Sequence, residues 1–227
     1  MSHRFRYAAR VLAMAILGCL SPGEYLGAYE IPLSPATLHE AYVLGRRNDQ
    51  ATAEFLSPYI HACSTTEQCT LIAQVELLTP FAQIVDLSQR RATSNYTEQQ
   101  ATDDYHRRGD KIIVQFTLIL PQAYATAQKR PAQENPPDDQ TSTLRPENFW
   151  QNYRFNLKQN AKLIPSRSVH SSPVYSAPTQ DKPSVLDGAA VFIEYEAKDV
   201  AQEDATVEIV TPEAKTLATT FELKKLR

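Results

Sequence analysis

Residues 111–120 read KIIVQFTLIL, and this stretch is the most strand-like in the 227-residue chain. Every second side chain is large and apolar, which predicts one buried face formed by Ile112, Val114, Phe116, Leu118 and Leu120. Ile113 and Ile119 add apolar surface to the opposite face. Because both faces favour burial, we expect a β-strand in the middle of a sheet.

The chain after residue 110 is expected to be mainly β. Alternating apolar and polar side chains predict four more strands, at residues 149–157, 190–196, 206–211 and 217–223. Short strands separated by turns favour an antiparallel meander or a sandwich. Two proline-rich segments, 125–146 and 165–188, are expected to be disordered or extended loops.

Helix signals dominate the region before the central strand. Ser34 can cap a helix whose first position is Pro35. A second helix is expected to begin at Asn48 or Asp49 and to end near Pro58, because proline lacks the backbone donor that a helix needs. The two helices would form a helical hairpin at the start of the domain.

Residues 70–89 fit more than one kind of element. Alternation at 71–77 and again at 81–87 favours two strands, or one strand bent at Pro80. Phe81, Ile84 and Val85 would also lie on one face of a helix, so the second half of this segment is ambiguous. We expect strands here.

The pattern as a whole indicates the α+β class. A capping box and a helix-ending glycine predict a polar surface helix between Thr97 and Gly109. We therefore expect an N-terminal helical hairpin packed on a mostly antiparallel β-sheet or sandwich, with long Pro-rich loops. One domain would cover residues 29–227, helical over 34–109 and mainly β over 110–227.

The first 28 residues have the layout of a secretory signal peptide. A basic start precedes an apolar run at 11–20, then a Pro22-Gly23 break and a small Ala28. The run is half the ~20 residues that a membrane-spanning helix needs. We expect cleavage after Ala28, no transmembrane span in the mature chain, and a secreted or periplasmic location.

Cys19 offers a second interpretation of the same region. Residues 16–19 read ILGC and resemble a bacterial lipobox, in which the cysteine receives a lipid and becomes the new N-terminus. Leu17 fits this motif less well than a small residue would. On this alternative, the chain is anchored to a bacterial membrane by a lipid on Cys19.

Cys63 and Cys69 remain after cleavage at Ala28, and they form an even pair in an oxidising compartment. A disulfide between them would stabilise the fold by about 2.4 kcal/mol through loop entropy. The spacing is not that of a Cys-x-x-Cys redox pair. A metal site with His61 would lack a second cluster of ligands, so we expect a structural disulfide and no metal.

Charge argues against two classes of partner. The chain has 23 basic and 26 acidic residues, and loss of residues 1–28 removes three arginines and one glutamate, which leaves 20 and 25 and a net charge of −5. Lysine and arginine do not cluster into a stripe. We therefore expect no nucleic acid partner and no attraction to an anionic lipid surface.

Catalytic candidates are few. Glu194 and Glu196 lie on the same face of a predicted strand, and paired carboxylates can serve acid–base hydrolysis or calcium binding. The simpler interpretation is a solvated strand face. The chain lacks Gly-x-Ser-x-Gly, His-Glu-x-x-His and a glycine-rich nucleotide loop, so no catalytic residue and no cofactor is predicted.

Aromatic side chains suggest a binding role. Trp150 is expected to face away from the Phe149 row, and Tyr124 and Tyr175 lie in the proline-rich segments. Exposed aromatics can bind sugars or peptides, although Trp150 could instead cover a second core layer.

The function expected from the sequence is that of an exported, non-enzymatic envelope or extracellular protein, binding or structural, with an envelope protein or glycan as partner. One alternative is a secreted hydrolase in which Glu194, Glu196 and His106 meet only in the fold. The other alternative is a lipid-anchored envelope assembly factor.

Overall fold

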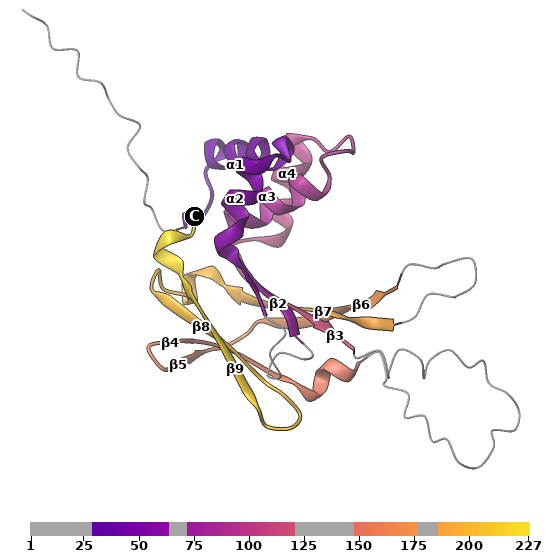
Figure 1. Ribbon diagram of the computed structural model, residues 1–227. Coiled ribbons are helices and arrows are strands. Elements are labelled where there is room, and N and C mark those ends of the chain that lie inside the picture. The colour runs from indigo at the N-terminus through magenta and orange to yellow at the C-terminus, as the bar shows by residue number, and fades with distance from the viewer. Residues whose placement is uncertain (1–28, 64–71, 121–147, 177–185) are drawn as a thin grey trace, which may run out of the picture.

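The computed structural model describes residues 29–63, 72–120, 148–176 and 186–227. Within these ranges the chain is an α+β protein in which a layer of helices lies beside two antiparallel β-sheets (Figure 1). None of the described helices is long and apolar enough to cross a bilayer.

Four α-helices make up the helical layer: α1 (Pro35–Arg47), α2 (Gln50–Leu56), α3 (Pro80–Arg90) and α4 (Glu98–Arg108). The predicted caps start three of them. Ser34 accepts a hydrogen bond from the Thr37 amide, and Asp49 caps α2 in the same way. At α4 both bonds of the capping box between Thr97 and Gln100 are present. These starts are set by local hydrogen bonds, which explains why the sequence predicted them.

The second strand predicted at 81–87 is wrong, because these residues belong to α3. The Thr79 side chain accepts a hydrogen bond from the Ala82 amide, and Pro80 occupies the first helical position. Eight residues of α3 are buried, on more than one side of the helix. Phe81, Ile84 and Val85 do follow the helical period, but Phe81, Val85 and Leu87 also fall on alternate positions, so the pattern fitted both elements.

The first sheet has five strands in the order β1-β2-β3-β7-β6. Their bounds are β1 (Ile60–Ala62), β2 (Ile72–Leu78), β3 (Lys111–Ile119), β6 (Ser168–Tyr175) and β7 (Leu186–Glu196). The strand predicted from residues 111–120 is confirmed as central: β3 pairs with β2 on one side and with β7 along its whole length on the other.

The second sheet has four strands in the order β5-β4-β8-β9. Its strands are β4 (Arg154–Gln159), β5 (Lys162–Ile164), β8 (Asp204–Val210) and β9 (Thr216–Glu222). The two sheets pack face to face, and the rings of Phe116 on β3 and Phe155 on β4 lie 4.7 Å apart between centroids. The main core therefore lies on the face of β3 that the sequence marked as apolar.

Two expectations for this half of the chain need correction. Residues 149–152 form a 3₁₀ helix, η4 (Phe149–Asn152), where a strand was predicted. Phe149 and Tyr153 are both buried and lie four residues apart, a spacing that fits a helical turn.

Residues 168–175, expected in a loop, form the edge strand β6. Because most of β6 is exposed, its sequence carries no apolar alternation, and Pro173 is tolerated at a sheet edge. The segment 125–146 lies outside the described residues.

Contacts between α1 and α3 dominate the helical layer. A Cβ atom built on Gly45 of α1 would lie 2.3 Å from the Val85 carbonyl oxygen of α3, so only glycine allows this approach. The layer is joined to the first sheet by Gln83 of α3, whose amide donates hydrogen bonds to the carbonyls of Leu78 and Lys111. α3 is thereby fixed over the outer face of β3.

Candidate functional site

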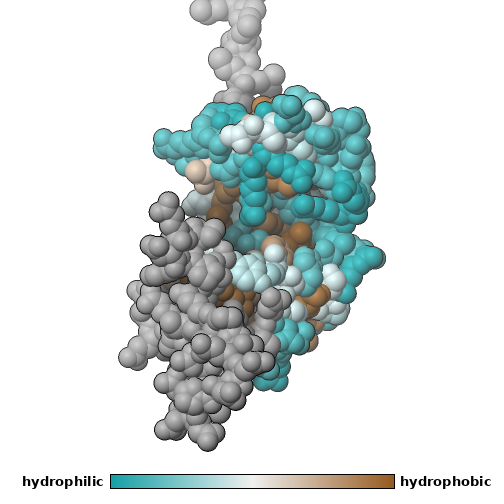
Figure 2. Space-filling model, turned by 90° about the vertical axis from the view of Figure 1, so that its right-hand side faces the viewer, coloured by the Kyte–Doolittle hydropathy of each residue, from teal (hydrophilic) through white to brown (hydrophobic). Residues whose placement is uncertain are grey.

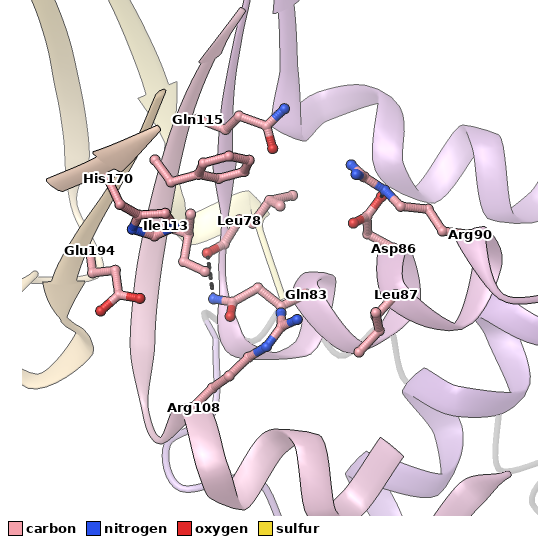
Figure 3. Close-up of a pocket in the computed structure, with 11 residues that line it drawn as sticks. Leu78, Gln83, Asp86, Leu87, Arg90, Arg108, Ile113, Gln115, His170 and Glu194 are labelled. Carbon is pink, nitrogen blue, oxygen red and sulfur yellow. Dashed lines mark hydrogen bonds and ion pairs between the residues drawn. The ribbon is translucent and has the colours of Figure 1, made fainter. Parts of the chain in front are cut away.

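A cavity of about 280 Å³ opens between α3, the end of α4 and the outer face of the five-stranded sheet; we call it the groove (Figure 3). Figure 2 shows this side of the molecule hollowed below the polar helical layer, with apolar residues inside the hollow. The groove is lined by Leu78, Gln83, Asp86, Leu87, Arg90, Arg108, Ile113, Gln115, His170, Phe192 and Glu194.

The sheet side of the groove follows from strand register. Successive side chains of a strand alternate between faces, so the apolar face of β3 turns toward the core and the other face turns toward α3. On this outer face Ile113 lies opposite Glu194 of β7. One row further along, Gln115 lies opposite Phe192, which in turn lies opposite His170 of β6. Three strands far apart in sequence thus form one wall.

His170 and Phe192 make a flat aromatic surface at this wall. Their rings are stacked, with centroids 5.1 Å apart and planes at 12°. Phe192 is half-buried and His170 is exposed. A planar or apolar group can lie against such a surface with little loss of side-chain freedom.

Gln83 supplies a fixed polar group in the groove. Its Nε2 donates to the Leu78 carbonyl at 3.1 Å and to the Lys111 carbonyl at 2.6 Å, so both N–H bonds are used. Its side-chain oxygen, Oε1, accepts no hydrogen bond from the described residues. Since Gln83 is 4% exposed, the amide is held in place and presents an acceptor to the groove.

Each carboxylate that lines the groove has a cation of its own. Asp86 accepts from Arg90 Nε at 2.9 Å, one helical turn along α3. Glu194 accepts from Lys111 Nζ at 2.6 Å. Burial alone would raise the pKa of Glu194, but hydrogen bonds from Lys111 and Ser168 and the charge of Lys111 outweigh it and lower the pKa below the ordinary value.

Arg108, at the end of α4, is the charged lining residue that lacks a partner. Among the described residues, no ion pair or hydrogen bond engages its guanidinium. Figure 3 shows the guanidinium reaching into the groove toward Gln83. Because Arg108 and Gln83 both line the groove, the same cavity holds a cation and an acceptor.

Glu76 of β2 lies behind the groove. It is 7% exposed and accepts hydrogen bonds from Gln74 Nε2 at 2.6 Å and Gln115 Nε2 at 3.4 Å. Burial raises the pKa of this carboxyl, and the nearby negative charge of Asp86 raises it further. Sequence reasoning did not single out this residue, because Glu76 occupies a polar position in the alternation of β2, as an ordinary solvent-facing side chain would.

The residues named for the hydrolase alternative do not converge. Glu194 lines the groove, but Glu196, the last residue of β7, does not line it and pairs with Arg167. His106 is exposed on α4 and contacts the ring of Tyr105. The pKa of Glu196 is lowered by the hydrogen bond and charge of Arg167. A general acid needs a raised pKa, whereas the pKa of both glutamates is lowered.

Two of the three cysteines lie outside the described residues. Cys63 follows β1 and is half-buried, whereas Cys69 and Cys19 are not among the described residues. The disulfide and the lipidation therefore stay predictions. Within the described ranges, no three His, Cys, Asp or Glu side chains are grouped so as to hold a metal ion.

The aromatic residues named from the sequence are dispersed. Trp150 lies in η4, partly buried against the core, rather than on a strand face. Tyr175 is 48% exposed at the end of β6, and Tyr124 lies outside the described residues. They form no common binding surface within the described part of the chain.

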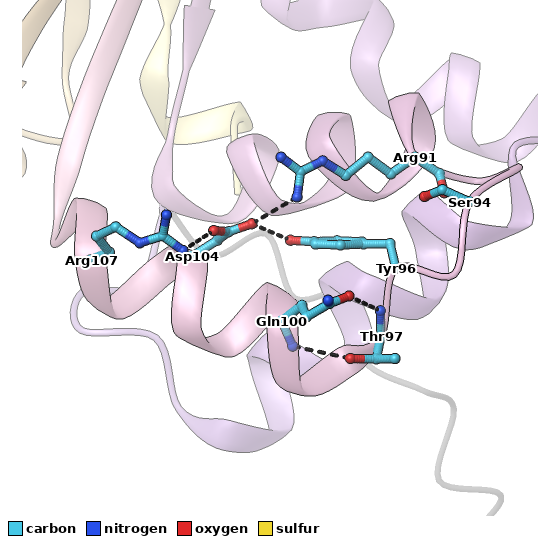
Figure 4. A network of polar contacts seen from close by, with 7 residues as sticks. All are labelled: Arg91, Ser94, Tyr96, Thr97, Gln100, Asp104 and Arg107. Carbon is cyan, nitrogen blue, oxygen red and sulfur yellow. Dashed lines mark hydrogen bonds and ion pairs between the residues drawn. The ribbon is translucent and has the colours of Figure 1, made fainter.

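A second polar cluster centres on Asp104 of α4 (Figure 4). Its carboxylate accepts hydrogen bonds from Tyr96 at 2.9 Å, from Arg91 at 3.2 Å and from Arg107 at 2.5 Å. Asp104 is 8% exposed, and its oxygens are occupied by these donors. The cluster fastens the connection between α3 and α4, which is a structural role.

Comparison with protein-family models, curated proteins and solved structures found no significant match to this chain.

Sequence reasoning missed most of the groove. It placed Phe192 on the same strand face as Glu194, but it did not predict β6, so His170 had no assigned neighbour. Gln83 was assigned to a strand, which would have turned its amide elsewhere. Arg108 looked like one of several charged residues on a surface helix, and no local signal distinguishes it from Arg107.

Proposed function

We propose that the chain is an exported, non-enzymatic protein of the envelope or extracellular space that binds a small ligand in the groove. The observation that carries the proposal is the lining: a fixed amide and an unpartnered cation converge above an apolar and aromatic wall. Small-molecule sites set placed polar groups against apolar walls, and the apolar part of this lining is formed by four residues, Leu78, Leu87, Ile113 and Phe192. In this proposal α1 and α2 act as an N-terminal helical hairpin, and the Pro-rich segment 125–146 is an extended loop of the exported domain.

The binding role is tested by filling the groove. Ile113→Trp places a large side chain in the cavity, whereas Ile119→Trp changes the same face of β3 at a residue that does not line it. The three proteins would be recovered from the extracellular or periplasmic fraction and compared by native mass spectrometry. We expect a noncovalently bound small molecule on the wild type and on Ile119→Trp, and its loss from Ile113→Trp. A wild type without adduct, or an adduct retained by Ile113→Trp, would contradict the role.

Export is tested separately by the mass of the mature chain. We expect an N-terminus at Tyr29 and an intramolecular disulfide between Cys63 and Cys69. A lipid on Cys19 would instead support the anchored alternative. Recovery of the uncleaved chain from the cytosol, with reduced thiols, would contradict export.

A further inference from the structure

We infer that the ligand of the groove is a small monocarboxylate with an apolar body, whose carboxylate binds Arg108 and whose body packs on Phe192 and Ile113. This inference rests on the proposed function, because it names the class of ligand for the same site.

Among the charged residues that line the groove, Arg108 is the one without an ion-pair partner in the described part of the chain. Asp86 is neutralised by Arg90 and Glu194 by Lys111, at 2.9 and 2.6 Å. Within the described chain Arg108 has no such counter-ion, although its guanidinium extends into the groove (Figure 3). A guanidinium presents a planar fork of donors that matches a carboxylate in two parallel hydrogen bonds. A single anionic group completes the charge balance.

The same balance disfavours other charged ligands. A dianion such as a phosphate monoester would gain one partner, Arg108, while the carboxylates of Asp86 and Glu194 line the same cavity. A cationic ligand would meet Arg108 while both carboxylates already have cations. A ligand with one negative charge is the class that these residues accommodate without leaving a charge unpaired.

Gln83 favours ligands that carry a hydrogen-bond donor as well as a carboxylate. Its Nε2 is committed to two backbone carbonyls, so the amide cannot turn without breaking both bonds. Its Oε1 faces the groove as an acceptor that no described residue uses. A hydroxyl or N–H group next to the ligand carboxylate would satisfy this acceptor, and we expect such compounds to bind better than the plain acid.

The remaining walls set the size and polarity of the body. Leu87, Ile113 and Phe192 are apolar, and the stacked pair of Phe192 and His170 offers a flat surface. A volume of about 280 Å³ lies just below the range for small-molecule sites, which is about 300–1,000 Å³. One aromatic ring or a short branched chain fits this space.

Phenylacetate and its uncharged amide, phenylacetamide, test the inference by calorimetric titration at pH 7. The two compounds have the same ring and nearly the same shape, and only the acid carries a charge. Three proteins are compared: the wild type, Arg108→Gln, and the control Arg154→Gln. Arg154 is an exposed arginine of the second sheet that likewise has no partner among the described residues and does not line the groove.

We expect the wild type and Arg154→Gln to bind phenylacetate with the same affinity. Arg108→Gln should bind it at least about tenfold more weakly, because a charge-assisted hydrogen bond is lost. Phenylacetamide should bind the wild type at least about tenfold more weakly than the acid, and Arg108→Gln should not change its affinity. A thermal melt of each variant establishes that the fold is retained, which the exposure of Arg108 predicts.

Three results would overturn the inference. Equal affinity of acid and amide would remove the carboxylate preference and leave binding in the groove intact. Binding of phenylacetate that Arg108→Gln leaves unchanged would place the anion elsewhere. Absence of binding by either compound would reject this ligand class, and the comparison of Ile113→Trp with Ile119→Trp would then decide the proposed function independently.

Discussion

Glu76 is a buried carboxyl on the polar face of the first sheet, and its burial lowers the stability of the folded chain at neutral pH. Its carboxyl is almost inaccessible to water and lies near a second carboxylate, Asp86, so its pKa is raised. Two glutamine amides donate to it, and Arg90 partly offsets the repulsion. Because the folded chain holds this proton to a higher pH than the unfolded chain does, folding is weakened as pH rises through the interval between the two pKa values.

Glu76→Gln is therefore expected to stabilise the protein at neutral pH. Glutamine has the same shape, and its oxygen can accept the hydrogen bonds from Gln74 and Gln115 without a charge. We expect an increase of roughly 1 kcal/mol in the free energy of unfolding at pH 7. The difference should shrink as pH falls below the pKa of an unperturbed glutamate, because Glu76 is then protonated in both states. Denaturant titrations at several pH values measure this.

Glu54→Gln is the matched control, because Glu54 is an exposed glutamate on α2. Its substitution should change stability by less than about 0.5 kcal/mol at every pH. Equal stability of Glu76→Gln and the wild type across the pH range would show that Glu76 is solvated in solution.

At the scale of elements, the contact between α1 and α3 shapes the helical layer. Gly45 is the point of closest approach: an added Cβ would lie 2.3 Å from the Val85 carbonyl oxygen and 2.6 Å from the Ser88 Cβ. No real Cβ atom tolerates the backbone contact, so α1 would have to move away from α3. The position of α3 in turn sets the position of Gln83 over the sheet.

Gly45→Ala tests this contact by the sign of its effect. Helix propensity alone favours alanine by about 1 kcal/mol in a helix interior. The steric clash opposes it, and we expect a net loss of about 1–3 kcal/mol in the free energy of unfolding. Val43→Ala on the exposed side of α1 should cost less than about 0.5 kcal/mol. Stabilisation of the Gly45 variant would mean that the two helices are further apart than described.

At the scale of the whole molecule, Arg227 joins the second sheet to the helical layer. The Tyr59 hydroxyl donates to the Arg227 carbonyl at 2.9 Å and accepts from its amide at 2.8 Å. The Thr79 hydroxyl donates to the same carbonyl, and the guanidinium lies over the Phe81 ring. The short 3₁₀ helix η6 (Leu223–Lys225), which follows β9, is thereby held against the helices (Figure 1).

Tyr59→Phe should loosen this junction while preserving the ring packing. The change leaves the Arg227 amide without a partner and removes one donor from its carbonyl, so we expect a loss of about 1–2 kcal/mol. Amide hydrogen exchange should accelerate at residues 222–227 in particular. Tyr42→Phe removes a hydroxyl that donates to the Tyr96 carbonyl inside the helical layer, and it should leave exchange at 222–227 unchanged. Equal exchange in both variants would place the junction elsewhere.

The sequence by itself determined the features that depend on near neighbours. Ser34, Asp49 and Thr97 start helices through hydrogen bonds to amides three residues away, and the alternation of residues 111–120 determined the central strand and its core face. Residues 81–87 carried both patterns, and the local cap at Thr79 and Pro80 starts the helix there. Tertiary structure decided that residues 168–175 form an edge strand. It also decided the groove, because Gln83, Arg108 and Phe192 come from three elements whose side chains meet only when α3 packs over the sheet. Helix caps and strand alternation depend on residues a few positions apart, so a single segment of sequence predicts them. The groove depends on side chains that are far apart in sequence, and their positions are set by how the elements pack.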